Sequence, residues 1–266
     1  MGNMNPLHSL PDPFLQTPKQ KEEKQLTFPL PSQPQFTFEN FIVHPGDALA
    51  FRAARAVCES PGSLFNPLYL HGESGGGKTH LLQAIRACVQ ENRGTAHLLS
   101  GRMSHEVFAF LVSLRESSSP AGSFILIDDL PELLGMIEGR SCFYDMVNMA
   151  VHRRLQLVCA GGEPVQSMPD LDDHLISRLR WGLIVRISPP DDPSRERILK
   201  KLARDWQVNL PPRVASFLVE RLPRDIASLS TGLAAVNAHA LSRGTRISIP
   251  VAREALDLLE AGKERR

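Results

Sequence analysis

The chain has 266 residues, which is long enough for one large domain or two modest domains with a buried core. Its composition, 42% hydrophobic and 22% charged, is that of an ordinary globular protein. With 30 basic and 29 acidic residues the net charge is only +1. A dedicated DNA-binding domain usually leaves a basic footprint, so this balance argues against a general polyanion binder.

The sequence carries no visible secretory or membrane signal. The N-terminus lacks a basic segment followed by an apolar one, and no apolar run is long enough to span a bilayer. The sequence has four cysteines, Cys58, Cys88, Cys142 and Cys159. They lack the spacing of metal ligands, which is typical of reduced thiols. We therefore expect a cytoplasmic protein without a membrane partner.

Residues 1–35 are rich in proline, glutamine and lysine and show no sustained periodicity, which predicts a flexible tail. From Phe36 onward, strand-like and helix-like patterns alternate. The expected strands are 68–71, 96–99, 124–127, 155–160 and 183–187, and the expected helices between them are 79–89, 104–115 and 141–154. This alternation predicts an α/β domain over residues 36–188, with a parallel sheet covered by helices on both faces.

After Pro189 the pattern becomes helical only. The expected helices are 192–205, 212–221, 225–242 and a last helix that starts at Pro250. They predict a small all-α domain over residues 189–266.

The segment "GESGGGKT", residues 72–79, follows an expected strand and opens an expected helix. This context favours a phosphate-binding loop of the form GxxxxGK[ST] over a coincidental glycine-rich turn. Backbone N–H groups of such a loop surround phosphate oxygens, and the helix N-terminus adds a favourable dipole. Lys78 would reach the β- and γ-phosphates, and Thr79 would hold Mg²⁺. The expected ligand is ATP or ADP, and the expected nucleotide-binding residues are Gly72, Ser74, Gly75, Gly76, Gly77, Lys78, Thr79 and His80.

Two carboxylates follow the buried strand in "FILIDDL", residues 124–130. A strand that delivers carboxylates at its C-terminal end suits a metal ion bound to phosphate. Asp128 is expected to bind Mg²⁺, and Asp129 to orient or deprotonate an attacking water. An acidic pair that caps a helix is the structural alternative, and the glycine loop upstream argues against it.

Three segments resemble the AAA+ domain of the DnaA/Hda family, which contains the bacterial replication initiator and its relatives. They are "FTFENFIV" at 36–43, "NPLYLHGESGGGKTHLLQAI" at 66–85 and "LDDHLISRLRWGL" at 171–183. The resemblance covers nearly the whole chain from Phe36 onward. It implies a P-loop AAA+ sheet domain followed by a small helical lid, with the nucleotide held at an interface between subunits.

Within "SRLRWG", Arg178 matches the arginine finger by which one subunit of this family reaches the γ-phosphate of its neighbour. Arginine suits this role because its fixed fork of donors neutralises transition-state charge, an effect of roughly 10³–10⁵ in rate in enzymes of this kind. The resemblance thus makes Arg178 a catalytic residue for a partner's site. A structural ion pair is the alternative role for this arginine.

The chain also departs from the family pattern. Ala227 stands where the lid helix normally presents an arginine to the nucleotide, with Arg224 about one turn earlier. The segment "AGGEP", residues 160–164, replaces polar sensing residues, and His174 replaces a family arginine before the finger. These departures imply that the chain binds nucleotide but hydrolyses its own ATP weakly.

Initiators of the family continue into a helix-turn-helix domain, whereas this sequence stops at Arg266. We therefore expect no sequence-specific DNA binding. In the tail, "QLTFPLP" resembles the motif by which bacterial proteins bind the sliding clamp, the β subunit of DNA polymerase III. The expected clamp-binding residues are Gln25, Leu26, Phe28, Pro29 and Leu30. An apolar strap that folds back onto the domain is the alternative for this segment.

Together these features resemble the layout of the Hda-type regulators of DnaA. The first hypothesis is a negative regulator of replication initiation, which binds the clamp and promotes hydrolysis of DnaA-bound ATP to give inactive DnaA–ADP. The second is a self-assembling, DnaA-like or helicase-loader-like AAA+ ATPase, in which the partner is a further copy of the chain. The third is a nucleotide-locked adaptor in which neither site hydrolyses ATP.

Overall fold

The computed structural model describes residues 36–116, 121–168, 171 and 173–263. The chain divides into two units, Met1–Ser32 and Gln33–Arg266, and all described residues belong to the second. The predicted tail and its clamp motif lie outside the described residues.

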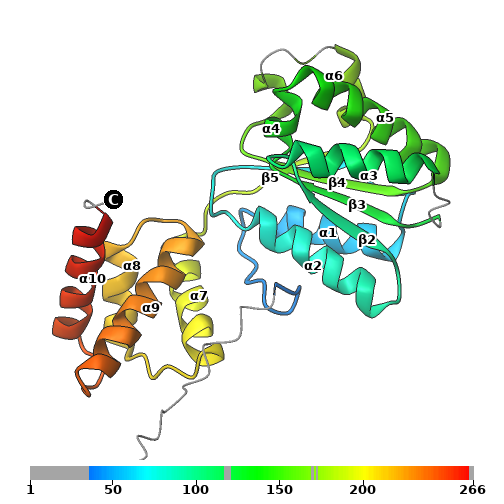
Figure 1. Cartoon of the computed structure of the whole chain (residues 1–266). Coiled ribbons are helices and arrows are strands. Elements are labelled where there is room, and N and C mark those ends of the chain that lie inside the picture. The colour runs from blue at the N-terminus through cyan, green and yellow to red at the C-terminus, as the bar shows by residue number, and fades with distance from the viewer. Residues whose placement is uncertain (1–35, 117–120, 169–170, 172, 264–266) are drawn as a thin grey trace, which may run out of the picture. The chain divides into compact units, whose positions relative to one another are not determined.

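A parallel sheet forms the centre of the α/β part (Figure 1). Its strands are β1 (Leu68–His71), β2 (Ala96–Ser100), β3 (Phe124–Asp128), β4 (Gln156–Gly161) and β5 (Leu183–Arg186). Their order across the sheet is β2-β3-β4-β1-β5, and all the paired strands run parallel. β1 is an inner strand, between β4 and β5, and its carboxyl end lies at the edge of the sheet where α/β folds bind ligands.

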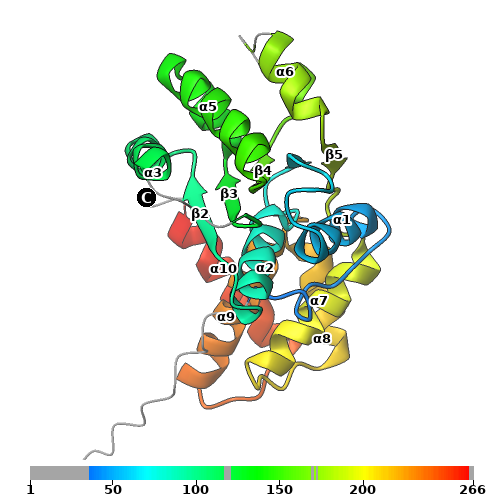
Figure 2. The ribbon, with the colours of Figure 1, turned by 90° about the vertical axis from the view of Figure 1, so that its right-hand side faces the viewer.

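Helices cover both faces of this sheet, as Figures 1 and 2 show. On one face lie α1 (Ala48–Glu59) and α2 (Lys78–Glu91), and on the other lie α3 (Ser104–Glu116) and α5 (Ile137–Arg153). The alternation of side chains along β1 explains the two cores. Leu68 and Leu70 pack with α1 and α2, whereas Tyr69 packs with α3 and α5. The three inner strands, β1, β3 and β4, are therefore mostly buried on both sides, as a doubly covered parallel sheet requires.

Shorter helices complete the α/β part. The helix α4 (Leu130–Leu134) follows β3, and a 3₁₀ turn, η1 (Val165–Ser167), follows β4. The helix α6 (Asp173–Arg180) leads into β5 and buries only Leu175 and Leu179. Half of the residues of α6 are exposed and remain open to contacts outside the chain's own core: Asp173, His174, Ser177 and Arg180.

The C-terminal part consists of α7 (Asp192–Asp205), α8 (Pro212–Arg221), α9 (Ile226–Ser242) and α10 (Ile249–Lys263). These helices lie together in Figure 2, and their buried side chains form one apolar core. Side chains of Asp191 and Asp225 accept hydrogen bonds from the first-turn amides of α7 and α9, so each carboxylate caps its helix. The buried Arg195 guanidinium joins α7 to the end of α8 by donating to the carbonyls of Val219 and Leu222.

The predicted fold class, a P-loop AAA+ sheet domain followed by a helical lid, is confirmed. The five observed strands differ from the predicted ones by at most one residue at each end. The sequence pattern did not predict α1, α4 or α6 as elements. No helix among the described residues is long and apolar enough to cross a membrane.

Candidate functional site

The glycine loop connects β1 to α2 and has a backbone that side chains would strain. Gly75 and Gly77 have φ angles of +74° and +101°, in the left-handed region that favours glycine. A Cβ atom at Gly75 would lie 2.3 Å from the Cβ of Asp225, and one at Gly77 would lie 3.0 Å from Cε2 of Phe41. The loop therefore requires glycine at both positions, for its own conformation and for its close neighbours.

Lys78 places its ammonium group inside this loop. Its Nζ donates to the carbonyl oxygens of Gly72 at 2.6 Å and Glu73 at 2.8 Å. Burial lowers the pKa of Lys78, while the nearby carboxylates of Asp128 and Asp129 act in the opposite direction. A cation thus lies where phosphate oxygens would enter the loop.

The next residue, Thr79, meets the end of β3. Its hydroxyl donates to Oδ2 of Asp128 over 2.7 Å, and Oδ1 of Asp128 accepts from the amide of Asp129 over 3.0 Å. These oxygens are hard ligands, and Mg²⁺ at nucleotide sites needs only one or two protein oxygens besides phosphate and water. The described residues hold no cluster of three or more side chains that could bind a metal ion. The pair Thr79–Asp128 therefore fits a magnesium ion brought by a nucleotide.

Asp129 differs from Asp128 in its surroundings. It adopts a left-handed conformation, with φ +52°, and its carboxylate pairs with Nε of Arg102 at 2.8 Å. The two carboxylates predicted to act together thus have separate partners. No feature of the sequence points to Arg102, which lies 27 positions earlier and follows β2.

His80, predicted to bind nucleotide, packs against the segment that precedes α1. Its Nε2 lies 2.9 Å from the carbonyl oxygen of Thr37, and its ring meets Phe36 and Phe41 edge-on at 5.0 and 5.1 Å. Burial lowers the pKa of His80, which favours the neutral imidazole. The aromatic pair was not predicted as site residues, although both belong to the quoted "FTFENFIV" segment.

The first turn of α9 also reaches the loop. The amide of Ile226 donates to the carbonyl oxygen of Gly75 at 3.3 Å, and Asp225 lies against the same glycine. Ala227, at the position where the family presents an arginine, lies in this turn. Arg224 instead pairs with Asp192 at 3.2 Å, within the helical part.

Arg178 lies on α6, with contacts that differ from those of the loop residues. Its guanidinium carbon is 4.1 Å from the ring centre of Trp181 and 5.5 Å from that of Tyr144. Neither ring belongs to the phosphate loop. Both ring contacts of Arg178 therefore lie outside the chain's own nucleotide site. His174 is exposed on the same helix.

The segment 160–164 begins at the end of β4. Among the described residues, no charged side chain of this segment contacts the phosphate loop. The hydroxyl of Tyr69 donates to the carbonyl oxygen of Glu163 in this segment at 2.7 Å. The segment is thus anchored through its backbone.

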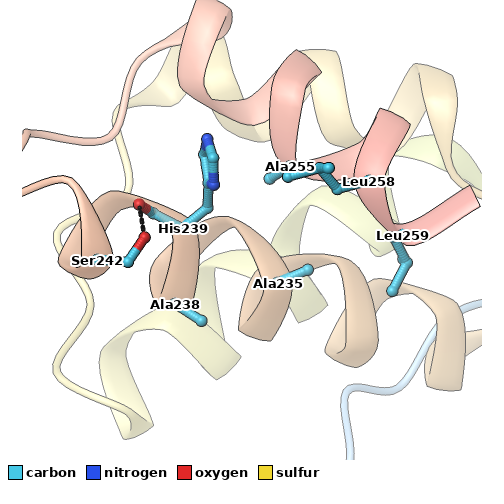
Figure 3. A pocket seen from close by; sticks show the side chains of 7 residues that line it. All are labelled: Ala235, Ala238, His239, Ser242, Ala255, Leu258 and Leu259. Carbon is cyan, nitrogen blue, oxygen red and sulfur yellow. Dashed lines mark hydrogen bonds between the residues drawn. The ribbon is translucent and has the colours of Figure 1, made fainter. Parts of the chain in front are cut away.

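A shallow groove lies between α9 and α10 (Figure 3). Its polar groups are few, and the Ser242 hydroxyl already donates to the carbonyl oxygen of His239 at 2.9 Å. The residues that line it are Ala235, Ala238, His239, Ser242, Ala255, Leu258 and Leu259. The histidine of this mostly apolar lining is already paired with the Glu254 carboxylate at 3.2 Å, so the groove suits a phosphate less well than the glycine loop does.

Comparison with known proteins agrees with the sequence resemblance. The model of the bacterial DnaA ATPase domain matches residues 32–186, and the model of the Hda lid domain matches residues 192–256. Domain III of the Thermotoga maritima replication initiation protein DnaA is similar with 27% identity and a TM-score of 0.75, over 86% of this chain and 98% of that one.

Two further solved structures are similar. AMPPCP-bound DnaA from Aquifex aeolicus shares 25% identity with a TM-score of 0.68, over 77% of this chain and 65% of that one. The Thermotoga maritima RuvB Holliday junction branch migration motor shares the fold at 18% identity, with a TM-score of 0.67 over 85% of this chain and 72% of that one. With its sheet domain, glycine loop and helical lid each matched in turn, the chain belongs to the DnaA/Hda family of AAA+ proteins, whose setting is the initiation of replication.

Proposed function

We propose that the chain is an Hda-type negative regulator of replication initiation. It binds ATP or ADP with Mg²⁺ at its own loop and supplies Arg178 to the ATP site of DnaA. Hydrolysis of the DnaA-bound ATP then gives DnaA–ADP. The matched Hda lid and the resemblance of the sequence to the family support this proposal.

The nucleotide part of the proposal rests on the loop chemistry. Lys78 and the loop amides would bind the phosphates, and Thr79 with Asp128 would hold the magnesium ion. The first turn of α9 would contribute the contact of Ile226 with the loop but no arginine, since position 227 is alanine. A lid without that arginine favours binding over efficient hydrolysis of the chain's own ATP.

The arrangement of Arg178 is the observation that carries the regulatory part. Half of the residues of its helix, α6, are exposed, and the guanidinium contacts two exposed rings rather than the phosphate loop. An arginine presented in this way can reach a phosphate that another subunit offers. Its planar fork can then neutralise the charge that develops on the transferred phosphoryl group.

The test is a single-turnover assay of ATP hydrolysis in purified DnaA, with the full chain and clamp-loaded DNA added. Arg178→Ala should remove most of the stimulation, by roughly 10³-fold if the finger acts at full strength. Arg180→Ala is the matched control because it removes a second arginine from the last turn of the same helix. Equal stimulation by wild type and Arg178→Ala would exclude the finger role.

The tail forms a separate part of the proposal. Gln25, Leu26, Phe28, Pro29 and Leu30 would anchor the chain in the apolar pocket of the sliding clamp, which raises its effective concentration near loaded DNA. Binding of the full chain to the purified clamp, compared with a Gln25→Ala/Leu30→Ala variant, tests this part. Equal binding by both proteins would remove the clamp anchor from the proposal.

The same preparations test the second hypothesis, a self-assembling ATPase. That hypothesis predicts appreciable ATP turnover by the chain alone, together with nucleotide-dependent assembly in sedimentation. Turnover that is independent of DnaA and depends on Arg178 would favour it over the regulatory proposal.

A further inference from the structure

Two aromatic side chains from different elements meet the arginine of α6. Tyr144 comes from α5, and Trp181 follows the last residue of α6. The guanidinium carbon of Arg178 lies 4.1 Å from the indole centre and 5.5 Å from the phenol centre, both within the range of a cation–π contact. We call Tyr144 and Trp181 the ring pair.

The ring pair is exposed to a degree that packing alone does not explain. Trp181 is 57% exposed and Tyr144 is 37% exposed, so neither ring is mainly part of the core. Tyrosine and tryptophan are enriched at interfaces, because each combines a large apolar ring with a polar group. Here the visible contact is with the one arginine that family resemblance marks as functional.

Two other surface arginines of the same part of the chain are held by carboxylates. Arg115 pairs with Asp145, and Arg102 pairs with Asp129. Within the described part of the chain, Arg178 has no such ion pair and is held by the rings instead. Because a ring face does not neutralise the guanidinium charge, an arginine held in this way keeps its attraction for a phosphate.

We propose that the ring pair positions Arg178 for a phosphate presented by a partner subunit, with Trp181 as the principal positioning residue. This inference rests on the proposed function of Arg178. An arginine side chain has many rotamers, and stacking on the rings restricts them before the partner arrives. The hold is weak, about two- to fivefold in a population ratio at an exposed site, so a charge-assisted bond to phosphate can replace it.

The first experiment needs no partner. The chain has two tryptophans, and Trp206→Phe leaves Trp181 as the only fluorescent indole. This replacement is mild because Trp206 packs on the lid core and its indole nitrogen has no hydrogen-bond partner among the described residues. In that background, Arg178→Ala should increase quenching of Trp181 by acrylamide, since it uncovers one face of the indole.

Arg180→Ala is the control in this background and should leave the quenching unchanged. Equal quenching in the parent, the Arg178→Ala and the Arg180→Ala proteins would show that the stack does not exist in solution and would overturn the inference. This result would leave the proposed function standing.

The second experiment measures stimulated hydrolysis of DnaA-bound ATP at saturating concentrations of the chain. Trp181→Ala should lower the maximal rate about two- to fivefold, with little change in the concentration that gives half of the stimulation. Trp181→Phe should retain most of the rate because a benzene ring still offers a face to the guanidinium. Tyr144→Ala should have a smaller effect, in line with its longer distance.

The outcomes separate the two proposals. A loss of stimulation in Arg178→Ala but not in Trp181→Ala would overturn only the positioning role. A change in half-saturating concentration or melting temperature that Trp181→Phe does not rescue would assign Trp181 a structural role and overturn the inference. If Arg178→Ala stimulates as well as wild type, the finger function fails and the positioning role falls with it.

Discussion

The phosphate loop and the helix α6 carry the two sets of functional residues, and they are built in opposite ways. The loop is held from within by glycine conformations, carbonyl contacts to Lys78 and the bond from Thr79 to Asp128. On α6, Arg178 stacks on exposed rings, and the helix itself buries only Leu175 and Leu179. The contacts of the loop thus suit a ligand of its own, whereas the proposed function has α6 meet a partner outside the chain.

Replacing the loop lysine tests this contrast most strongly. Lys78→Ala removes a charged donor to phosphate, and we expect nucleotide affinity to fall about 10- to 100-fold. Arg178→Ala should leave the same affinity unchanged, because its contacts lie outside the loop. Titration with a fluorescent ADP or ATP analogue measures both values.

Lys200→Ala is the control for that titration, because Lys200 pairs with Glu196 on the surface of α7. If Arg178→Ala weakens binding as much as Lys78→Ala does, the separation of the two regions is wrong.

The conformation of the loop is the next point to disturb. Gly75→Ala forces a left-handed residue and a clash with Asp225, so we expect a loss of about 1–2 kcal/mol in the free energy of unfolding. Thermal or denaturant unfolding monitored by circular dichroism measures this loss. Gly162→Ala is the matched control, since a Cβ there meets nothing within 4 Å. Similar losses in both variants would mean that the loop has no special strain.

Asp128→Asn sharpens the description of the metal site. The amide oxygen can still accept from Thr79, whereas the amide nitrogen cannot accept from the Asp129 N–H, so the negative charge and one of the two hydrogen bonds are lost. We expect the gain in nucleotide affinity that Mg²⁺ provides to shrink by about three- to tenfold, as measured by calorimetry with magnesium or with EDTA. Asp145→Asn, which alters a surface ion pair with Arg115, should retain the full magnesium effect. A full effect in Asp128→Asn would move the metal ligand elsewhere.

The smallest expected effect concerns pH. The ordinary histidine pKa is 6.5, and burial lowers the pKa of His80 below that value in the folded state. The unfolded state therefore binds more protons near this pH, so this contribution to stability is present above pH 6.5 and is lost as the pH falls below it. His71 and His97 shift in the same direction, also through burial.

His80→Gln should accordingly make the fall in melting temperature between pH 7.5 and about pH 5 shallower, without abolishing it. The control is His174→Gln on the exposed face of α6, which should keep the wild-type profile. A wild-type profile in His80→Gln would show that this imidazole does not contribute.

The fold could be predicted well where the pattern is local. The strands are short apolar runs between loops, and the phosphate loop is contiguous with its strand and helix. The helix α1 was not predicted because its buried stripe consists mostly of alanine, with the residues Ala50, Ala53, Ala54 and Val57. The five-residue helix α4 is too short to show a period.

The site could be predicted only in the parts that lie within one segment. Pairs such as Arg102 with Asp129, or Arg178 with Tyr144, join residues that are distant in the sequence. Local motifs pointed to Asp129 and Arg178, but no local signal points to their partners, because only the packing of the elements brings each pair together. The roles assigned to the loop residues and to Arg178 therefore remain predictions for the experiments above.

The bond between the Ile226 amide and the Gly75 carbonyl sets a scale for communication across the molecule. One net hydrogen bond contributes about 1 kcal/mol, so its presence or loss can change an equilibrium about fivefold. If this bond forms differently with different nucleotides, the helical part can report the bound nucleotide only as a modest bias. Because such coupling is reciprocal, a partner that binds α9 and changes this bond can alter the nucleotide affinity by the same modest factor. Coupling through this hydrogen bond is therefore graded and modest, and it does not act as an all-or-none switch.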